Sequence, residues 1–136
     1  MARSQGKRVK ITVRDGLPFA VATVEHRGQE AVLENVLLDT GSAGTILSAD
    51  RLAEIGVRYQ PEDSIHRIRG VGGTELVFSK RLDYLAMGDL GLVGFEVEIG
   101  ALDYGFDFDG IVGVDFLMAV GAVIDLGNLV LHGSRA

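Results

Sequence analysis

The sequence lacks cysteine altogether and has no uninterrupted apolar segment of membrane-spanning length. Without cysteine, disulfides, thiolate nucleophiles and cysteine-based metal sites are excluded. Asp125 and several glycines divide the apolar C-terminal region into pieces that are too short to span a bilayer. The basic start, MARSQGKRVK, also lacks the apolar stretch of a secretory signal. We therefore expect a soluble, cytoplasmic chain without membrane insertion, frayed over residues 1–7.

Positive charge is scarce as well. The chain has 13 Lys and Arg against 19 Asp and Glu, which gives a net charge of −6 at pH 7. This balance argues against a nucleic-acid partner, because contacts to phosphates need clustered cations. A length of 136 residues fits one domain with a real core. We predict a single domain over residues 1–136, with no linker and no repeat.

The patterns that are present are mostly those of β-strands. Val9, Ile11 and Val13 alternate with polar residues, the segment 15–18 breaks the run, and the segment 19–25 resumes it. This spacing predicts a β-hairpin. A second turn at residues 26–29 leads into a third strand, Glu30 to Leu38, which becomes apolar throughout as it approaches Asp39. A strand buried on both faces would bring that acid to the interior.

The residues after this strand read LLDTGSAGTIL, from Leu37 to Leu47. A purely structural loop is one interpretation, since Asp39 and Ser42 suit turns and Gly41 permits positive φ. A short helix is expected next, with Ser48 as its N-cap and Gly56 as its end.

Further elements follow in the second half of the chain. The pattern of the segment from Ile65 to Ser79 predicts a long hairpin whose tip holds Gly70, Val71, Gly72 and Gly73. We also expect a strand pair at Leu82 to Ala86 and Val93 to Ile99, a strand through Ile111 and Val112, a helix capped by Asp115 and closed near Gly121, and two short strands at Ala122 to Asp125 and Asn128 to Leu131.

Three of these motifs together resemble the aspartic proteases. LLDTGSAGTIL is similar to their active-site loop, GVGG at residues 70–73 to their flap, and DGIVGVDFL at residues 109–117 to the apolar-apolar-Gly loop and helix that follow. One Asp-Thr-Gly in 136 residues resembles the retropepsin branch, whose protomers each carry one such motif. The resemblance spans Val9 to Leu131. It implies a closed, mostly antiparallel β-barrel with a flap hairpin and one or two short helices.

The resemblance also implies an activity, that of a homodimeric aspartic endopeptidase acting on a peptide or protein substrate. Two carboxyl groups in contact share one proton, so that one can accept a proton from water while the other donates one. This chain supplies one such acid, Asp39, and a two-fold axis would bring it to its own copy. By analogy, Thr40 would form a hydrogen bond across the axis, and Gly41 would leave room for substrate and for the turn.

Residues for substrate binding follow from the same resemblance. The hydroxyl of Ser42 is expected to donate to Asp39, the flap tip to close over an extended peptide, and apolar side chains to form pocket walls. The residues expected to bind substrate are Ser42, Gly70, Val71, Gly72, Gly73, Ile111 and Val112, and Leu47 is a further candidate for a wall. Segments 7–13 and 128–131 correspond to the ends that family members pair across the dimer interface.

Other interpretations have less support. Asp103, Asp107 and Asp109 suggest calcium, but the spacing of an EF-hand requires an acid where Gly105 stands, so we expect no metal and no cofactor. The three histidines lie far apart in sequence, and the serines lack the Gly-x-Ser-x-Gly pattern of a serine hydrolase. The alternative that remains is a catalytically silent retropepsin fold that serves as a dimerisation or peptide-binding module.

Overall fold

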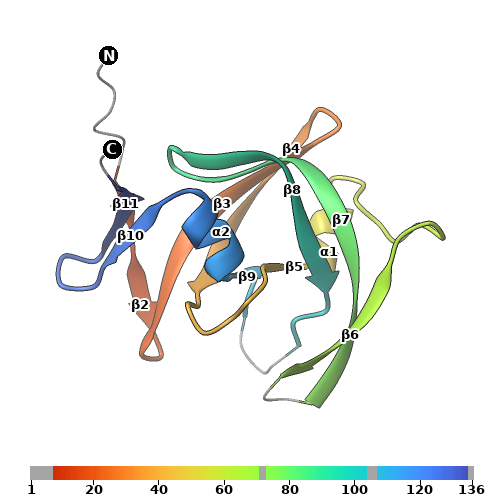
Figure 1. Ribbon diagram of the computed structural model, residues 1–136, viewed down its shortest axis with the longest axis horizontal. Helices are drawn as coiled ribbons and strands as arrows, with labels where there is room; N and C mark the ends of the chain where they lie inside the picture. Colours follow the sequence, from red (N-terminus) through yellow and green to blue (C-terminus); the bar gives the residue numbers. More distant parts are fainter. Residues whose placement is uncertain (1–7, 71–72, 104–106, 135–136) are drawn as a thin grey trace.

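Six strands pair in a closed ring and form a β-barrel (Figure 1). The structure is a computed structural model that describes residues 8–70, 73–103 and 107–134. Two further strands, β2 (Thr12–Arg14) and β6 (Ile65–Gly70), extend the same sheet beyond the ring. The predicted mostly β, closed-barrel fold is confirmed. The ring consists of β3 (Leu17–His26), β4 (Gln29–Leu38), β9 (Gly110–Val112), β5 (Ile46–Ser48), β8 (Leu90–Gly100) and β7 (Gly73–Met87), and a β3–β7 pairing closes it.

Tight turns join the first strands, as the sequence predicts. Asp15 and Gly16 have φ angles of 53° and 75° and link β2 to β3. Arg27 and Gly28 have φ angles of 51° and 82° and link β3 to β4. Two consecutive positive φ angles match the right-handed twist of paired strands, which is why glycine stands second in each turn.

The strand β9 lies between β4 and β5 and determines the course of loop 39–45. It is parallel to β4, with Leu37 opposite Ile111 and Leu38 opposite Val112, and antiparallel to β5. All three residues of β9 are buried, and Val112 has no exposed surface. The loop that leaves β4 and enters β5 therefore crosses the end of β9.

The first helix, α1 (Ala49–Ala53), confirms the prediction made from its cap. The side chain of Ser48 accepts the backbone N–H of Arg51, which would otherwise have no partner inside the helix. Leu52 is fully buried on the inner face. Gly56 has a φ of 80°, a left-handed conformation that suits glycine and ends the turn.

The second helix, α2 (Val114–Ala119), corrects one prediction. Its N-cap residue is Gly113, which makes no side-chain cap, and Asp115 lies inside the first turn. The prediction that Asp115 is the N-cap is wrong, because it lies inside the helix, where its carboxylate accepts hydrogen bonds from Thr45 and from the backbone N–H of Phe116. Phe116 is fully buried and packs edge-on against Phe95, with ring centroids 5.7 Å apart. No helix in the described part of the chain is long and apolar enough to cross a membrane.

A separate three-stranded sheet contains both ends of the described chain. Its order is β1 (Val9–Lys10), β11 (Val130–Gly133) and β10 (Ala122–Asp125) (Figure 1). The last strand begins two residues later than predicted, since Asn128 closes a turn by donating to Asp125 through its backbone and its side chain.

The terminal segments thus pair within one chain, contrary to the prediction that they pair across a dimer interface. β11 lies between β1 and β10 and has both edges occupied. Removing the residues after Asp125 would therefore break this sheet within the protomer. Such a truncation does not report on dimerisation alone.

An ion pair in the segment before β6 makes the acid stability of the protein testable. Asp63 accepts hydrogen bonds from Lys80 Nζ at 2.7 Å and from the backbone N–H of Gln60 at 2.7 Å. The hydrogen bond from Lys80 is the main cause that holds the pKa of Asp63 below its usual value of 3.8. Because the pKa is lower in the folded state, ionised Asp63 stabilises the fold above about pH 4, and this stabilisation is lost as the pH falls through the folded-state pKa.

We expect Asp63→Asn to lower the urea midpoint at pH 7 and to lose this effect progressively toward pH 3. Urea unfolding followed by circular dichroism across this range measures the gap between the variant and the wild type. Asp107→Asn, at an exposed position, is the matched control. A gap of the same size at every pH would contradict the assignment.

Candidate active site

The turn at residues 39–42 holds the Asp39 carboxylate directly beyond the end of β4. The backbone N–H of Asp39 donates to the carbonyl of Val112 at 3.0 Å, and the N–H of Ser42 donates to the carbonyl of Asp39 at 3.1 Å. The N–H of Gly41 donates to Asp39 Oδ1 at 2.9 Å. A Cβ at residue 41 would lie 3.3 Å from that same oxygen, so glycine gives the carboxylate its closest access to the backbone. Asp39 is half-buried, with Thr40 exposed beside it.

Ser42 takes a different partner from the one predicted. Its hydroxyl donates to the carbonyl of Gly44 at 2.8 Å, across the loop, and not to Asp39. The prediction that Ser42 donates to the catalytic carboxylate is therefore wrong for this structure. The hydroxyl tightens the loop, while Asp39 receives the backbone N–H of Gly41.

A second set of contacts joins the loop to the start of α2. Thr45, almost fully buried, donates its hydroxyl to Asp115 Oδ1 at 2.8 Å and its backbone N–H to Asp115 Oδ2 at 3.2 Å. The same hydroxyl accepts the N–H of Gly113 at 3.1 Å, and the N–H of Val114 donates to the carbonyl of Ser42 at 2.9 Å. The loop that carries Asp39 is thus held at both ends.

The residue at position 113 offers a test of this attachment. A Cβ on Gly113 would lie 2.5 Å from the carbonyl oxygens of both Ser42 and Gly44, closer than real Cβ contacts allow. We expect Gly113→Ala to cost about 1–3 kcal/mol of stability, as overpacking does, because the loop must move. Gly44→Ala is the matched control, since a Cβ there meets nothing within 4 Å. The urea midpoints of the two variants measure the difference, and equal midpoints would contradict the prediction.

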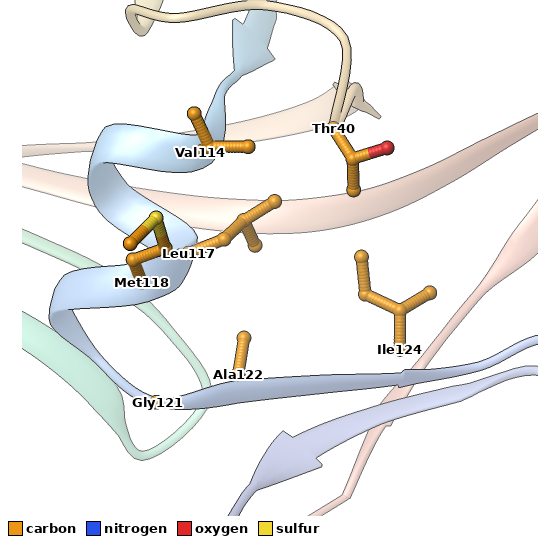
Figure 2. A pocket seen from close by; sticks show the side chains of 7 residues that line it. All are labelled: Thr40, Val114, Leu117, Met118, Gly121, Ala122 and Ile124. Atoms are coloured by element: carbon orange, nitrogen blue, oxygen red, sulfur yellow. The ribbon is translucent and has the colours of Figure 1, made fainter.

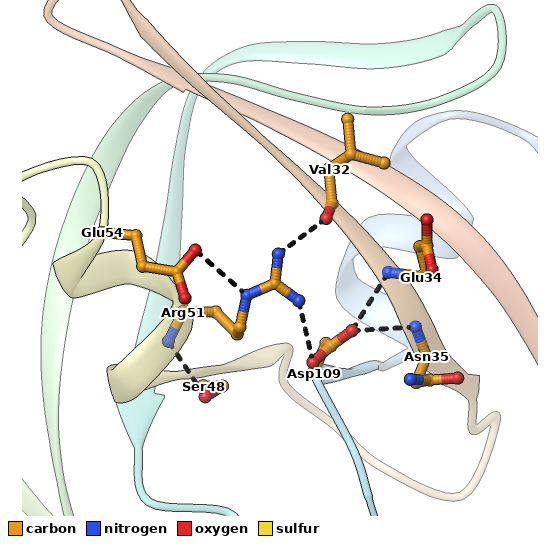
Figure 3. A network of polar contacts seen from close by, with 7 residues as sticks. All are labelled: Val32, Glu34, Asn35, Ser48, Arg51, Glu54 and Asp109. Carbon is orange, nitrogen blue, oxygen red and sulfur yellow. Dashed lines mark hydrogen bonds and ion pairs between the residues drawn. The ribbon is translucent and has the colours of Figure 1, made fainter.

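A second carboxylate, Asp109, lies directly before β9, at the end of that strand opposite the Asp39 loop (Figure 3). Its buried carboxylate accepts the backbone N–H groups of Glu34 and Asn35, each at 3.0 Å. Its other oxygen lies 3.1 Å from Arg51 Nη1. Arg51 also donates to the carbonyl of Val32 at 2.9 Å. One carboxylate thereby joins β4, the start of β9 and α1.

The same contacts affect the pKa of Arg51. Burial by itself would lower the pKa of Arg51, but attraction to Asp109 and Glu54, with the hydrogen bonds to both, outweighs burial and raises the pKa. The carboxylate of Asp109 is therefore bound by groups of its own chain. Within residues 8–70, 73–103 and 107–134, no group of three or more His, Asp or Glu side chains is placed to hold a metal ion.

The apolar residues expected to form substrate pockets lie in two different settings. Ile111 is 9% exposed and belongs to a small apolar cluster with Phe19, Leu37 and Leu102. Val112 and Leu47 have no exposed surface and lie in the main core, so neither side chain reaches solvent in this chain.

The glycines of the predicted flap end a real hairpin. Gly70 of β6 is opposite Gly73 of β7, at the end of a pairing that runs from Ile65 and Phe78. The prediction of a long glycine-tipped hairpin is confirmed up to this pair. Val71 and Gly72 lie outside the described residues.

The sequence does not reveal the structural roles of two carboxylates: Asp115, which holds the Asp39 loop through Thr45, and Asp109, which joins β4, β9 and α1. Asp109 was considered as a possible metal ligand and Asp115 as a helix cap. A local signal existed for one contact: Thr45 is a polar residue at the start of an apolar strand, and buried hydroxyls need partners. Nothing near Thr45 in the sequence identifies that partner, which lies 70 residues further along the chain.

A closed β-barrel whose Asp-Thr-Gly turn crosses the end of a parallel strand pair defines an acid protease of the single-domain, retropepsin-like class. A family model described as aspartyl protease matches residues 22–116, from β3 into α2, and the chain belongs to this family. The match includes the Asp39 loop and the hairpin. No protein among the curated sequences compared with the chain matches it.

Proposed function

We propose that this protein is an aspartic endopeptidase whose active site forms between two copies of the chain. The observation that carries the proposal is the Asp39 carboxylate, half-buried, oriented by the Gly41 N–H and held on a loop attached at both ends. Each chain contributes one Asp-Thr-Gly turn. Acid–base hydrolysis without a metal requires two proton-transferring groups, so the second one comes from a symmetric partner.

In the proposed reaction, the two Asp39 carboxyls hold one proton between them and a water molecule. The ionised carboxylate takes a proton from water as its oxygen attacks the peptide carbonyl carbon, and the protonated one donates to the carbonyl oxygen. The tetrahedral intermediate then loses its C–N bond. The proton taken from water passes to the leaving nitrogen, and a hydroxyl of the intermediate returns a proton to the other carboxylate as the product's carboxyl group forms, so that the pair again holds one proton.

The peptide substrate is proposed to lie extended across the Asp39 loop. Extended peptides bind by pairing their backbone with exposed strands and by placing alternate side chains in pockets. Ser42 and Ile111 flank the loop, and Gly70 and Gly73 lead to the hairpin tip that would close over the substrate. Val71 and Gly72 are proposed for the tip itself, Thr40 and Gly41 for the floor beside Asp39, and Val112 acts through its carbonyl, which orients Asp39.

A subunit-mixing experiment tests the shared site. Wild-type enzyme is mixed with Asp39→Asn chains at constant total concentration and allowed to exchange, and hydrolysis of fluorescently labelled casein is measured at mildly acidic pH. If each site needs one Asp39 from each chain, activity falls with the square of the wild-type fraction, to about one quarter at equal amounts. A site contained in one chain gives a linear fall, to about one half.

The control is a mixture with Asp107→Asn chains, which should leave activity unchanged. A linear fall would contradict the shared site. A wild-type dimer that hydrolyses no casein and binds no statine-type peptide, an analogue of the transition state, would favour the catalytically silent module instead.

A further inference from the structure

Two apolar regions adjoin the loop that carries Asp39. One is a hollow between α2 and β10, which Thr40 overhangs from the loop (Figure 2). The described residues that line this hollow include no charged side chain. The other region is the small cluster that contains Ile111 and Leu102. Here a charged side chain, that of Glu75, forms a hydrogen bond with the backbone of the cluster.

Glu75 lies on the part of the long hairpin that projects from the barrel (Figure 1). β7 pairs with β8 only from Phe78 onward, opposite Ile99. Among the described strands, residues 73–77 of β7 pair with β6 alone. We call residues 65–70 and 73–77 the arm. Because β8 does not pair with the arm, side-chain contacts are needed to hold it against the barrel.

The carboxylate of Glu75 makes such a contact with the segment that follows β8. Its Oε2 accepts the backbone N–H of Leu102 at 3.1 Å. A Cβ at residue 100 would lie 2.5 Å from the same oxygen and 2.8 Å from Cγ1 of Val77, closer than real Cβ contacts allow. Gly100 therefore lets two side chains of the arm pack against bare backbone of the barrel.

Leu102 has a backbone conformation that its surroundings must maintain. Its φ is 55°, in the left-handed region that residues other than glycine rarely adopt. Its side chain is 3% exposed and belongs to the cluster with Leu37 and Ile111, and its N–H is the one that Glu75 accepts. Such a conformation persists only where the surrounding contacts fix it. Removal of the Glu75 acceptor should therefore also affect the position of the Leu102 side chain.

The cluster leads directly to the proposed reacting acid. Leu37 lies on β4, two residues before Asp39, and Ile111 is opposite Leu37 on β9. The next residue of β9, Val112, accepts the backbone N–H of Asp39. Through Leu102, the arm is thus joined to apolar side chains beside the Asp39 loop.

We propose that Glu75 is a positioning residue of the peptidase, which keeps Leu102, and with it the apolar wall beside Asp39, aligned with the arm. The inference rests on the proposed function, because it assigns this wall to substrate binding. The wall and the arm that closes over the peptide then take up their positions together. Glu75 acts through Leu102 and not on the reacting atoms, so its loss weakens the binding of substrate and transition state alike. Such a loss raises KM and leaves kcat nearly unchanged.

Two substitutions of Glu75 test this role. Glu75→Ala removes the acceptor, whereas Glu75→Gln keeps one, because its amide oxygen can accept the Leu102 N–H. With labelled casein, we expect Glu75→Ala to raise KM about threefold to tenfold, as for the loss of one hydrogen bond, and to change kcat by less than about twofold. Glu75→Gln should bring KM back to within about twofold of the wild type.

Hydrogen exchange of the Leu102 amide, followed by NMR, reports on the contact without any need for activity. Exchange should be faster in Glu75→Ala and close to that of the wild type in Glu75→Gln. Glu96→Ala removes a carboxylate from β8 that is 57% exposed, and this matched control should behave as the wild type in both measurements.

The outcomes separate this role from the proposed function. If Glu75→Ala leaves KM unchanged, any loss of activity comes from the amount of folded enzyme, and the positioning role is wrong. A KM for Glu75→Gln as high as that of Glu75→Ala would make the charge responsible and would also overturn the role. Either result, with the square-law result of subunit mixing intact, leaves the proposed function standing. A wild-type protein that hydrolyses no casein would overturn both.

Discussion

Asp39→Asn is expected to lower the rate of peptide hydrolysis by about a hundredfold to ten-thousandfold, the range associated with loss of a general acid–base group. An amide of nearly the same volume neither takes the proton from water nor donates one to the substrate. The Gly41 N–H still finds an acceptor in the amide oxygen, so the loop should keep its shape. Fold and dimer should survive while catalysis is lost.

Hydrolysis of labelled casein measures the effect, and circular dichroism with sedimentation equilibrium shows whether fold and assembly persist. Asp103→Asn, at an exposed position, controls for the loss of one negative charge. Because both copies in the dimer carry the substitution, no carboxyl remains to shuttle protons. Activity close to that of the wild type would require a different acid and would end the assignment of Asp39.

Asp109→Ala is expected to cause the largest loss of stability, about 2–4 kcal/mol. The substitution leaves the N–H groups of Glu34 and Asn35 without their acceptor and Arg51 without its main counter-charge. We place the value below that of a fully buried ion pair, because the Arg51 side chain is 30% exposed and water can solvate it. The free energy of unfolding in urea measures the effect.

Asp109→Asn separates the contributions of hydrogen bonding and charge, since the amide oxygen can still accept from the backbone. We expect a smaller loss for it than for the alanine variant. Asp107→Ala, two residues earlier and exposed, should change stability by no more than about 0.5 kcal/mol. If the Asp107 and Asp109 variants were equally stable, the structural role given to Asp109 would be wrong.

These two predictions concern carboxylates with different surroundings and different roles. Asp39 is half-buried on a loop, whereas Asp109 is buried and contacts three elements of its own chain. A carboxylate that accepts two backbone N–H groups and a guanidinium has most of its roughly four acceptor sites occupied. Burial together with these hydrogen bonds therefore distinguishes the supporting acid from the one proposed to react.

Elements with local signals were predicted well from the sequence. The helix after Ser48 was identified from its cap and from its final glycine, and both act as expected. The turn at Arg27 and Gly28 and the long hairpin that ends at Gly70 and Gly73 follow from glycine placement and alternation. The information for such features lies within a few residues of the chain.

The sequence alone predicted Asp39 as the reacting acid, since the apolar strand before it and the Thr-Gly turn after it are contiguous. The tertiary structure alone decided the long-range contacts of the surrounding elements: Thr45 meets Asp115 across 70 residues, and Asp109 meets Asn35 across 74. Those pairs exist because β9 runs parallel to β4, a pairing that no local pattern encodes. The structure likewise decided that β11 pairs within its own chain, because only the folded barrel brings the two ends together.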